Sequence, residues 1–204
     1  MSTSSTIIDE IETMRKSGLA SLAMHFYDFR EAKKKDLRGL LSSMLFQLCD
    51  QSISYYEIMS AFFSAHLHGS QSPSDKELTR CLNDLLQLPG QVPIFLIVDA
   101  LDECANTSVL PSPRQAVLRL LGELVDSQLP NLRICVTSRP EADIRPVLEP
   151  LTFRSISLHD ESGQMKDIEN YIKAVVNSSR KMRRWKPEDK QLVIDVLSER
   201  ADGM

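Results

Sequence analysis

The chain has 204 residues and a mass of 23.1 kDa, the size of one ordinary domain with a single hydrophobic core. With 42% hydrophobic and 25% charged residues, its composition excludes an extended disordered chain or a fibrous repeat. The net charge of -4 disfavours nucleic acid as a partner, and no apolar run approaches the roughly 20 residues that span a bilayer. Because the polar start also lacks the apolar stretch of a signal peptide, we expect a cytoplasmic protein with no membrane partner.

The first third of the chain predicts one strand followed by two helices. Residues 19–27 are an apolar run between polar neighbours, long enough for a strand that is buried on both faces. Apolar residues recur at three- and four-residue spacing over residues 37–48, which predicts a helix with one buried stripe. A second helix is expected over residues 55–66.

Two more helices are marked by capping boxes, in which a serine precedes the first turn and a Glu or Gln follows three residues later. Ser74 and Glu77 form one such box, and we expect Gly90 to close the helix that follows it. Ser112 and Gln115 form the other. Leucines at helical spacing follow each box, so both helices are expected to pack on the core.

Three further strands are expected among these helices. Residues 94–98 are a continuous β-branched and aromatic run, typical of the middle of a parallel sheet, and residues 132–137 supply the next strand. Residues 153–158 form a weaker, alternating strand, and helices over residues 164–177 and 187–200 complete the chain. Strands separated by helices need crossover connections, so the sequence predicts an α/β fold with a parallel sheet flanked by helices.

Two other features suggest no site. A basic stretch with one tryptophan, residues 180–186, could contact nucleic acid, but a solvated connector between two helices is the better interpretation in an acidic chain. The cysteines lack the short paired spacings of zinc or redox sites, so we expect reduced, mostly buried thiols. They are Cys49, Cys81, Cys104 and Cys135.

Acidic residues follow the most apolar strand, in the segment DALDEC. Asp99 stands at the end of the strand, and Asp102 and Glu103 lie in the turn beyond it. The carboxyl ends of strands in an open α/β sheet form the usual ligand crevice, where one acid can hold Mg²⁺ and another can orient an attacking water. The alternative is that these acids only form a turn or cap a helix, which is common after a strand.

A second polar segment, Thr137-Ser138-Arg139-Pro140, follows the next strand. The five donors of the Arg139 guanidinium would suit the terminal phosphate of a nucleotide. The alternative is a solvated arginine before a proline turn.

Together these segments resemble a known family. FLIVDALDEC followed by RICVTSRPE is similar to the Walker B strand and the sensor strand of NACHT-domain P-loop NTPases, which belong to the STAND class. HFYDFR, DIENYIKAVV and the terminal ERADGM are similar to the fungal NLR-like branch, the nephrocystin-3-like N-terminal domains. The resemblance covers nearly the whole chain.

The resemblance implies a P-loop NTPase fold of the STAND type and a signalling switch that exchanges ATP, or GTP, with Mg²⁺. By resemblance, Asp99 would serve the metal ion, and Asp102 or Glu103 would act as the catalytic acid that positions the attacking water. Arg139, with Thr137 beside it, would contact the nucleotide at its γ-phosphate.

A P-loop requires Gly-x-x-x-x-Gly-Lys-Ser/Thr, and none of the seven glycines in this sequence is followed by lysine. The resemblance places residues 4–11 in the helix that follows the loop, and it places the strand before the loop between the sensor strand and the last strand. We therefore expect a marginally stable chain that lacks the first strand of the sheet. Residues 1–159 would be a partial nucleotide domain, and residues 160–204 would begin the helical subdomain.

Three hypotheses follow from this pattern. In the first, the chain is part of a NACHT-type switch that binds nucleotide weakly, and whether it still hydrolyses the nucleotide is left open. Alternatively, it is a non-catalytic module that associates with itself or with full-length NACHT relatives. The third hypothesis is a gene start placed too late, with the loop encoded upstream.

Overall fold

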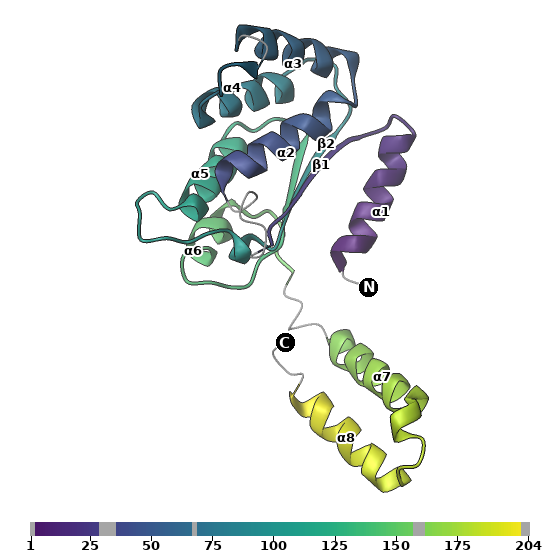
Figure 1. The fold of residues 1–204 in the computed structure, drawn as a ribbon. Helices are drawn as coiled ribbons and strands as arrows, with labels where there is room; N and C mark the ends of the chain where they lie inside the picture. The colour runs from purple at the N-terminus through teal and green to yellow at the C-terminus, as the bar shows by residue number, and fades with distance from the viewer. Residues whose placement is uncertain (1–2, 29–35, 67–68, 157–161, 201–204) are drawn as a thin grey trace. The chain divides into compact units, whose positions relative to one another are not determined.

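The computed structural model describes residues 3–28, 36–66, 69–156 and 162–200 (Figure 1). The chain divides into two compact units, Met1–Thr152 and Phe153–Met204, and each is described by itself. The boundary expected after residue 159 lies outside the described residues. The assignment of the two units to a partial nucleotide domain and a helical subdomain stays a prediction.

The first unit is built on a parallel three-stranded sheet. Its strands are β1 (Ser21–Phe26), β2 (Ile94–Asp99) and β3 (Leu132–Val136), in the order β1-β2-β3. Ser21 pairs with Ile94, which pairs with Leu132 on its other side. The most apolar run of the sequence thus forms the central strand, as its composition predicts. The parallel α/β architecture and these three strands are confirmed.

Helices cover both faces of this sheet, because each face presents apolar side chains that must be buried. On one face lie α2 (Leu37–Cys49), α4 (Asp75–Leu86) and α5 (Pro113–Asp126), and their leucines form the larger core. On the other face lies α1 (Thr3–Lys16), whose Ile11 packs in a smaller cluster with apolar residues of the sheet (Figure 1). α3 (Ile53–Ala65) packs on α2 and α4. The helices predicted in this unit are confirmed, although α1 extends five residues beyond the expected residues 4–11 and the end of α4 differs.

Both predicted capping boxes are present. Ser74 and Glu77 start α4, and Ser112 and Gln115 start α5. In each box the serine side chain accepts from the backbone N–H of the Glu or Gln, whose side-chain oxygen accepts from the serine N–H. The expectation that Gly90 closes α4 is wrong. The helix ends at Leu86 in a cap with ordinary right-handed backbone, and Gly90, with φ +73°, supplies the left-handed conformation for the turn that leads to β2.

The predicted fourth strand does not form over residues 153–156, and residues 157 and 158 lie outside the described residues. Phe153 is fully exposed and Ile156 is 59% exposed. An alternating segment becomes a strand only when its backbone groups pair with a neighbouring strand, and residues 153–156 pair with no strand in the described part of the chain.

The second unit is a pair of helices, α7 (Ser162–Ser178) and α8 (Pro187–Arg200), which confirms the two helices predicted there. They pack against each other and bury Val176 and Ile194. The basic stretch of residues 180–186 forms the connection between them. In the described part of the chain, no helix combines the length and the hydropathy needed to cross a bilayer.

Candidate functional site

The acidic segment forms a tight turn at the carboxyl end of β2. Asp99 is the last residue of the strand, and Ala100 adopts a left-handed conformation with φ +55°. This bend starts a short 3-10 helix, Leu101–Glu103, which is anchored by the fully buried Leu101 side chain. A left-handed alanine is unusual, and here it turns Asp102 toward the loop that follows β3.

The end of β3 is joined to this turn through Thr137. Thr137 Oγ1 donates a 2.6 Å hydrogen bond to Asp99 Oδ1 and accepts a 3.0 Å bond from the Ala100 N–H. The Leu101 N–H donates to the Thr137 carbonyl oxygen at 3.0 Å. The hydroxyl therefore holds the Asp99 carboxylate in one orientation at the edge of the sheet.

Asp102 and Arg139 form the second link between the two loops. The Arg139 backbone N–H donates to Asp102 Oδ1 at 3.1 Å, and the Arg139 Nε lies 3.4 Å from Asp102 Oδ2. The Asp102 side chain is 12% exposed and that of Arg139 is 80% exposed, so solvent screens the pair and its contribution to stability is small. Both carboxylate oxygens of Asp102 are thus engaged by one residue.

The structure brings the predicted site residues to one end of the sheet. Asp99, Asp102, Thr137 and Arg139 are connected by direct hydrogen bonds or ion pairs, and Glu103 lies in the same turn as Asp102. Among the described residues, no group of three or more His, Cys, Asp or Glu side chains is placed to hold a metal ion.

Sequence reasoning missed a buried arginine behind this turn. Arg114, in the first turn of α5, pairs with Asp143 through Nη1 at 3.1 Å, and Asp143 also accepts from Asn106 at 3.0 Å. The Arg114 guanidinium donates to the carbonyl oxygens of Asp102 and Cys104 as well. A cation in the first turn of a helix opposes the helix dipole, and this was the one available signal.

The thiols take no part in the site chemistry. Burial raises the pKa of Cys104 and the pKa of Cys81 to about 11, so both thiols stay protonated near neutral pH and are poor nucleophiles and metal ligands. All four cysteines are thiols, but only these two are buried, since Cys49 and Cys135 are partly exposed. The expectation of mostly buried thiols therefore holds for two of the four.

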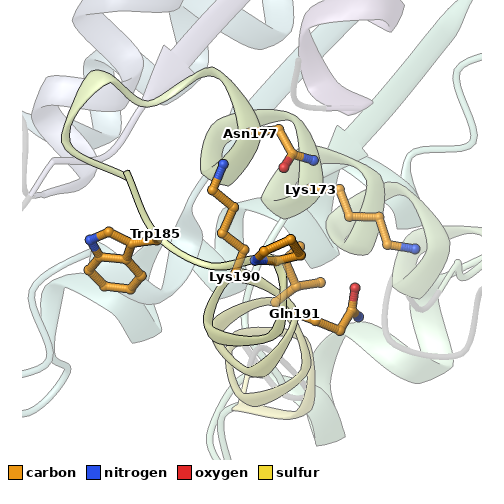
Figure 2. A pocket seen from close by; sticks show the side chains of 7 residues that line it. Lys173, Asn177, Trp185, Lys190 and Gln191 are labelled. Atoms are coloured by element: carbon orange, nitrogen blue, oxygen red, sulfur yellow. The ribbon is translucent and has the colours of Figure 1, made fainter. Parts of the chain in front are cut away.

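A hollow in the second unit contains none of the predicted site residues. It is lined by residues of α7, of α8 and of the connection between them, and Lys173 on this surface is paired with Glu169. Figure 2 shows Lys173, Asn177, Trp185, Lys190 and Gln191 around it. Its lysines stand on α7 and α8 and its tryptophan on the connection between them, all within the second unit.

Comparison with known proteins gives one family. The family model described as Nephrocystin 3, N-terminal, matches residues 2–139, which is more than half of the chain and includes both polar loops up to Arg139. No curated protein and no solved structure matches the chain. The chain therefore belongs to the nephrocystin 3 N-terminal family.

Proposed function

We propose that this chain supplies the Mg²⁺- and γ-phosphate-contacting edge of a NACHT-type, nucleotide-dependent signalling switch of the P-loop NTPase class. The observation that carries the proposal is that two directly bonded pairs, Asp99 with Thr137 and Asp102 with Arg139, lie at the carboxyl ends of adjacent parallel strands. This edge is where open α/β sheets bind ligands. The acids and the arginine are the types of group that phosphoryl-transfer sites use.

The donor set at this edge fits Mg²⁺ bound to a nucleoside triphosphate. Asp99 and Thr137 offer hard oxygen ligands, and Mg²⁺ in such sites is usually held by one or two carboxylates together with waters and phosphate oxygens. ATP or GTP with Mg²⁺ would supply the phosphoryl group and the charge neutralisation when bound. Asp99 would orient the metal ion, and the Thr137 hydroxyl would hold Asp99 in place.

Arg139 and Asp102 would change partners on binding. In the structure the exposed guanidinium of Arg139 lies against the nearly buried Asp102 carboxylate. A γ-phosphate carries more negative charge than one carboxylate and would compete for the guanidinium. Asp102, or Glu103 in the same turn, would then accept a hydrogen bond from the attacking water. The pair would thus link phosphate recognition to the exposure of the candidate catalytic acid.

We expect weak nucleotide binding by this chain, because the sequence contains no Gly-Lys phosphate loop to surround the β- and γ-phosphates. Calorimetric titration of the purified chain with MgATP and MgGTP should show no saturable binding in the micromolar range. A micromolar or tighter dissociation constant contradicts the weak-binding part of the proposal.

A graft tests the site itself. A designed strand and loop carrying Gly-x-x-x-x-Gly-Lys-Thr is joined ahead of α1, and MgATP binding is measured by calorimetry. We expect the graft to bind MgATP, and we expect Asp99→Asn and Arg139→Ala each to weaken that binding at least about 10-fold. The matched controls Asp126→Asn and Arg145→Ala change exposed residues outside this edge and should not affect binding. Equal binding by all four variants contradicts the assigned roles.

A second candidate function is a non-catalytic module that pairs with a P-loop-containing relative. The observation that favours it is the outer edge of β3, which has no neighbouring strand among the described residues. The Thr137 N–H donates to the Val98 carbonyl oxygen, and the Asn131 carbonyl oxygen accepts from the Ile94 N–H. Backbone N–H groups alternate in direction along a strand, so the N–H of Ile134, three residues before Thr137, points away from β2. Ile134→Pro should therefore abolish co-purification with such a relative and leave β2 pairing intact. Retention of the complex contradicts this route of association.

A further inference from the structure

The two edges of the sheet have different neighbours. The outer edge of β1 lies beside α2, whereas the outer edge of β3 has no strand beside it in the described part of the chain. An edge strand presents rows of backbone N–H and C=O groups that readily pair with another chain. Whether the backbone groups of an edge are already hydrogen-bonded therefore decides whether a further strand can pair with that edge.

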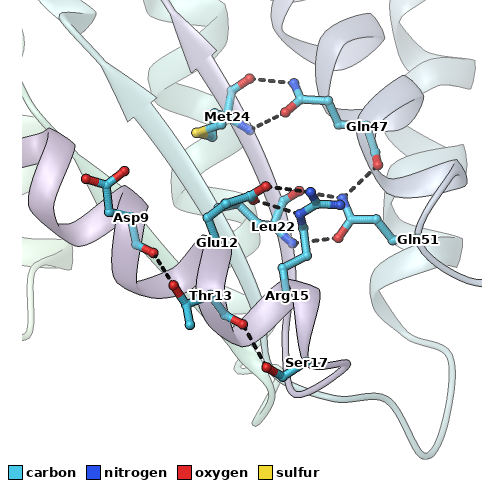
Figure 3. Close-up of polar contacts among 9 residues, drawn as sticks. All are labelled: Asp9, Glu12, Thr13, Arg15, Ser17, Leu22, Met24, Gln47 and Gln51. Atoms are coloured by element: carbon cyan, nitrogen blue, oxygen red, sulfur yellow. Dashed lines mark hydrogen bonds and ion pairs between the residues drawn. The ribbon is translucent and has the colours of Figure 1, made fainter.

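At the β1 edge, the side chains of Gln47, near the end of α2, and of Gln51, just beyond that end, occupy the place of a strand (Figure 3). Gln51 Oε1 accepts from the Leu22 N–H at 2.9 Å, and Gln51 Nε2 donates to the Leu22 carbonyl oxygen at 2.6 Å. Gln47 makes the same two bonds with Met24, at 3.0 Å and 2.6 Å. In an antiparallel sheet, one residue of the neighbouring strand exchanges this same pair of bonds with the residue opposite.

The spacing of the helix matches the spacing of the strand. Gln51 follows Gln47 by four residues, just past the end of α2, where its N–H bonds to the Leu48 carbonyl oxygen. Four residues of helix rise about 6 Å, which is close to the repeat of about 6.7 Å between the peptide groups of Leu22 and Met24 along the strand. The higher-numbered glutamine contacts the lower-numbered strand residue. The two glutamines thus present their amides in the order of an antiparallel strand.

Further hydrogen bonds hold both amides in these orientations. Gln47 Nε2 also donates to Ser43 Oγ at 2.9 Å, and Gln51 Nε2 donates to the Gln47 carbonyl oxygen at 2.7 Å. Ser43 Oγ donates to the Met24 carbonyl oxygen at 3.3 Å. The opposite side of α2 is fixed in the larger core by buried residues. These are Leu40, Leu41, Met44, Leu45 and Leu48.

We infer that Gln47 and Gln51 form a glutamine clamp, a side-chain substitute for a strand, that keeps the β1 edge from pairing with a second copy of this chain. Without the clamp, two β1 strands could pair antiparallel, with Leu22 of each copy opposite Met24 of the other. That pairing would use the same four backbone groups that the clamp occupies. The clamp and the β1 dimer are therefore mutually exclusive, and strand addition is left to the β3 edge.

Amide hydrogen exchange on the wild-type chain tests the clamp without any substitution. The N–H groups of Ala23 and His25 face β2, because those of Ser21 and Tyr27 bond to the segment that contains β2. Residue-resolved exchange followed by NMR should show Leu22 and Met24 protected to the same order as these neighbours. Exchange of the two outward amides at the rate of an open edge overturns the proposal.

Substitution tests the consequence for self-association. Gln47→Met with Gln51→Met keeps side-chain length and helix propensity but removes all four clamp bonds. We expect exchange at Leu22 and Met24 to accelerate at least about 10-fold. Analytical ultracentrifugation should show dimers at concentrations where the wild-type chain is monomeric. For Gln51→Met alone we expect faster exchange at Leu22 but not at Met24, because Gln47 still bonds to Met24, and a smaller association constant than for the double variant.

The matched control is Gln191→Met on α8, whose amide bonds only to the exposed Asp195 carboxylate. It should leave both exchange at β1 and the oligomeric state unchanged. A folded double variant that keeps its protection overturns the clamp. A folded double variant that loses protection and stays monomeric overturns the role of the clamp against a second copy.

Discussion

Thr137 Oγ1 lies 2.6 Å from Asp99 Oδ1, so a hydroxyl from the end of β3 orients the carboxylate at the end of β2. The two residues are 38 positions apart in the sequence. Through this bond the loops that carry the candidate site share one rigid edge. A substitution that removes this bond should therefore affect the stability and the geometry of both loops.

Thr137→Val should lower the free energy of unfolding by about 2 kcal/mol, because the isosteric change removes a hydrogen bond to a carboxylate and the acceptor of the Ala100 N–H. Urea denaturation followed by circular dichroism measures this, with an unchanged m-value expected. The control, Thr152→Val, loses only an exposed bond to a helical carbonyl and should cost much less. Equal effects of the two substitutions would contradict the structural role of Thr137.

Arg114→Met should lower the free energy of unfolding by about 2 to 3 kcal/mol. It removes the Nη1 donor that contacts both carboxylate oxygens of Asp143, and it removes donors from two carbonyl oxygens of the acidic turn. A double-mutant cycle with Asp143→Asn should give a coupling energy of about 1 kcal/mol or more. Arg119→Met, at an exposed position of the same helix, is the control. A coupling energy near zero would show that the two side chains do not interact.

Stability should fall in acid partly through Glu77. Hydrogen bonds from the Ser74 hydroxyl and N–H lower the pKa of Glu77 to about 2 from an ordinary value of 4.5. A depressed folded-state pKa stabilises the protein above the unfolded pKa, and this contribution disappears as the pH falls from about 4.5 to about 2.

The difference in melting temperature between the wild-type chain and Glu77→Gln should therefore be largest above pH 5 and should shrink through that acidic window. Thermal denaturation at a series of pH values measures it. Glu123→Gln, on an exposed face of α5, serves as the reference. A difference that grows toward low pH would have the wrong sign for a depressed pKa.

Thiol labelling should follow burial. With pKa values of about 11, only about one in a thousand of the Cys81 and Cys104 thiols is ionised at pH 8, and both are buried. Iodoacetamide should therefore modify Cys49 and Cys135 first in the folded protein, as peptide mass spectrometry would show. After unfolding in urea, all four should react at similar rates. Labelling of folded Cys104 as fast as Cys49 would contradict the packing around the acidic turn.

Patterns that depend on neighbouring residues were predictable. The run over residues 94–98 became β2, and the serine boxes at Ser74 and Ser112 start helices, because burial of an apolar run and capping of a first turn require only nearby groups. The exact end of α4 was not predictable, since Gly90 serves the turn into β2 and not the helix itself.

Long-range features were predictable only in outline. That the acids and Arg139 would lie at one edge follows from the parallel order of strands. That Thr137 holds Asp99, or that Arg139 is paired with Asp102, depends on the bend at Ala100 and on the course of the chain beyond β3. Arg114 had only a weak signal, because its partner Asp143 is 29 residues away.

The sequence by itself determined β1, β2, β3 and the main helices, and which polar residues stand at the strand ends, because hydrophobic periodicity and capping are encoded within a few residues. Only the tertiary structure decided which of those residues touch, how Gln47 and Gln51 close one edge of the sheet, and that residues 153–156 form no strand. These outcomes depend on the distances between segments far apart in the chain, and such distances are set by the packing of the whole core.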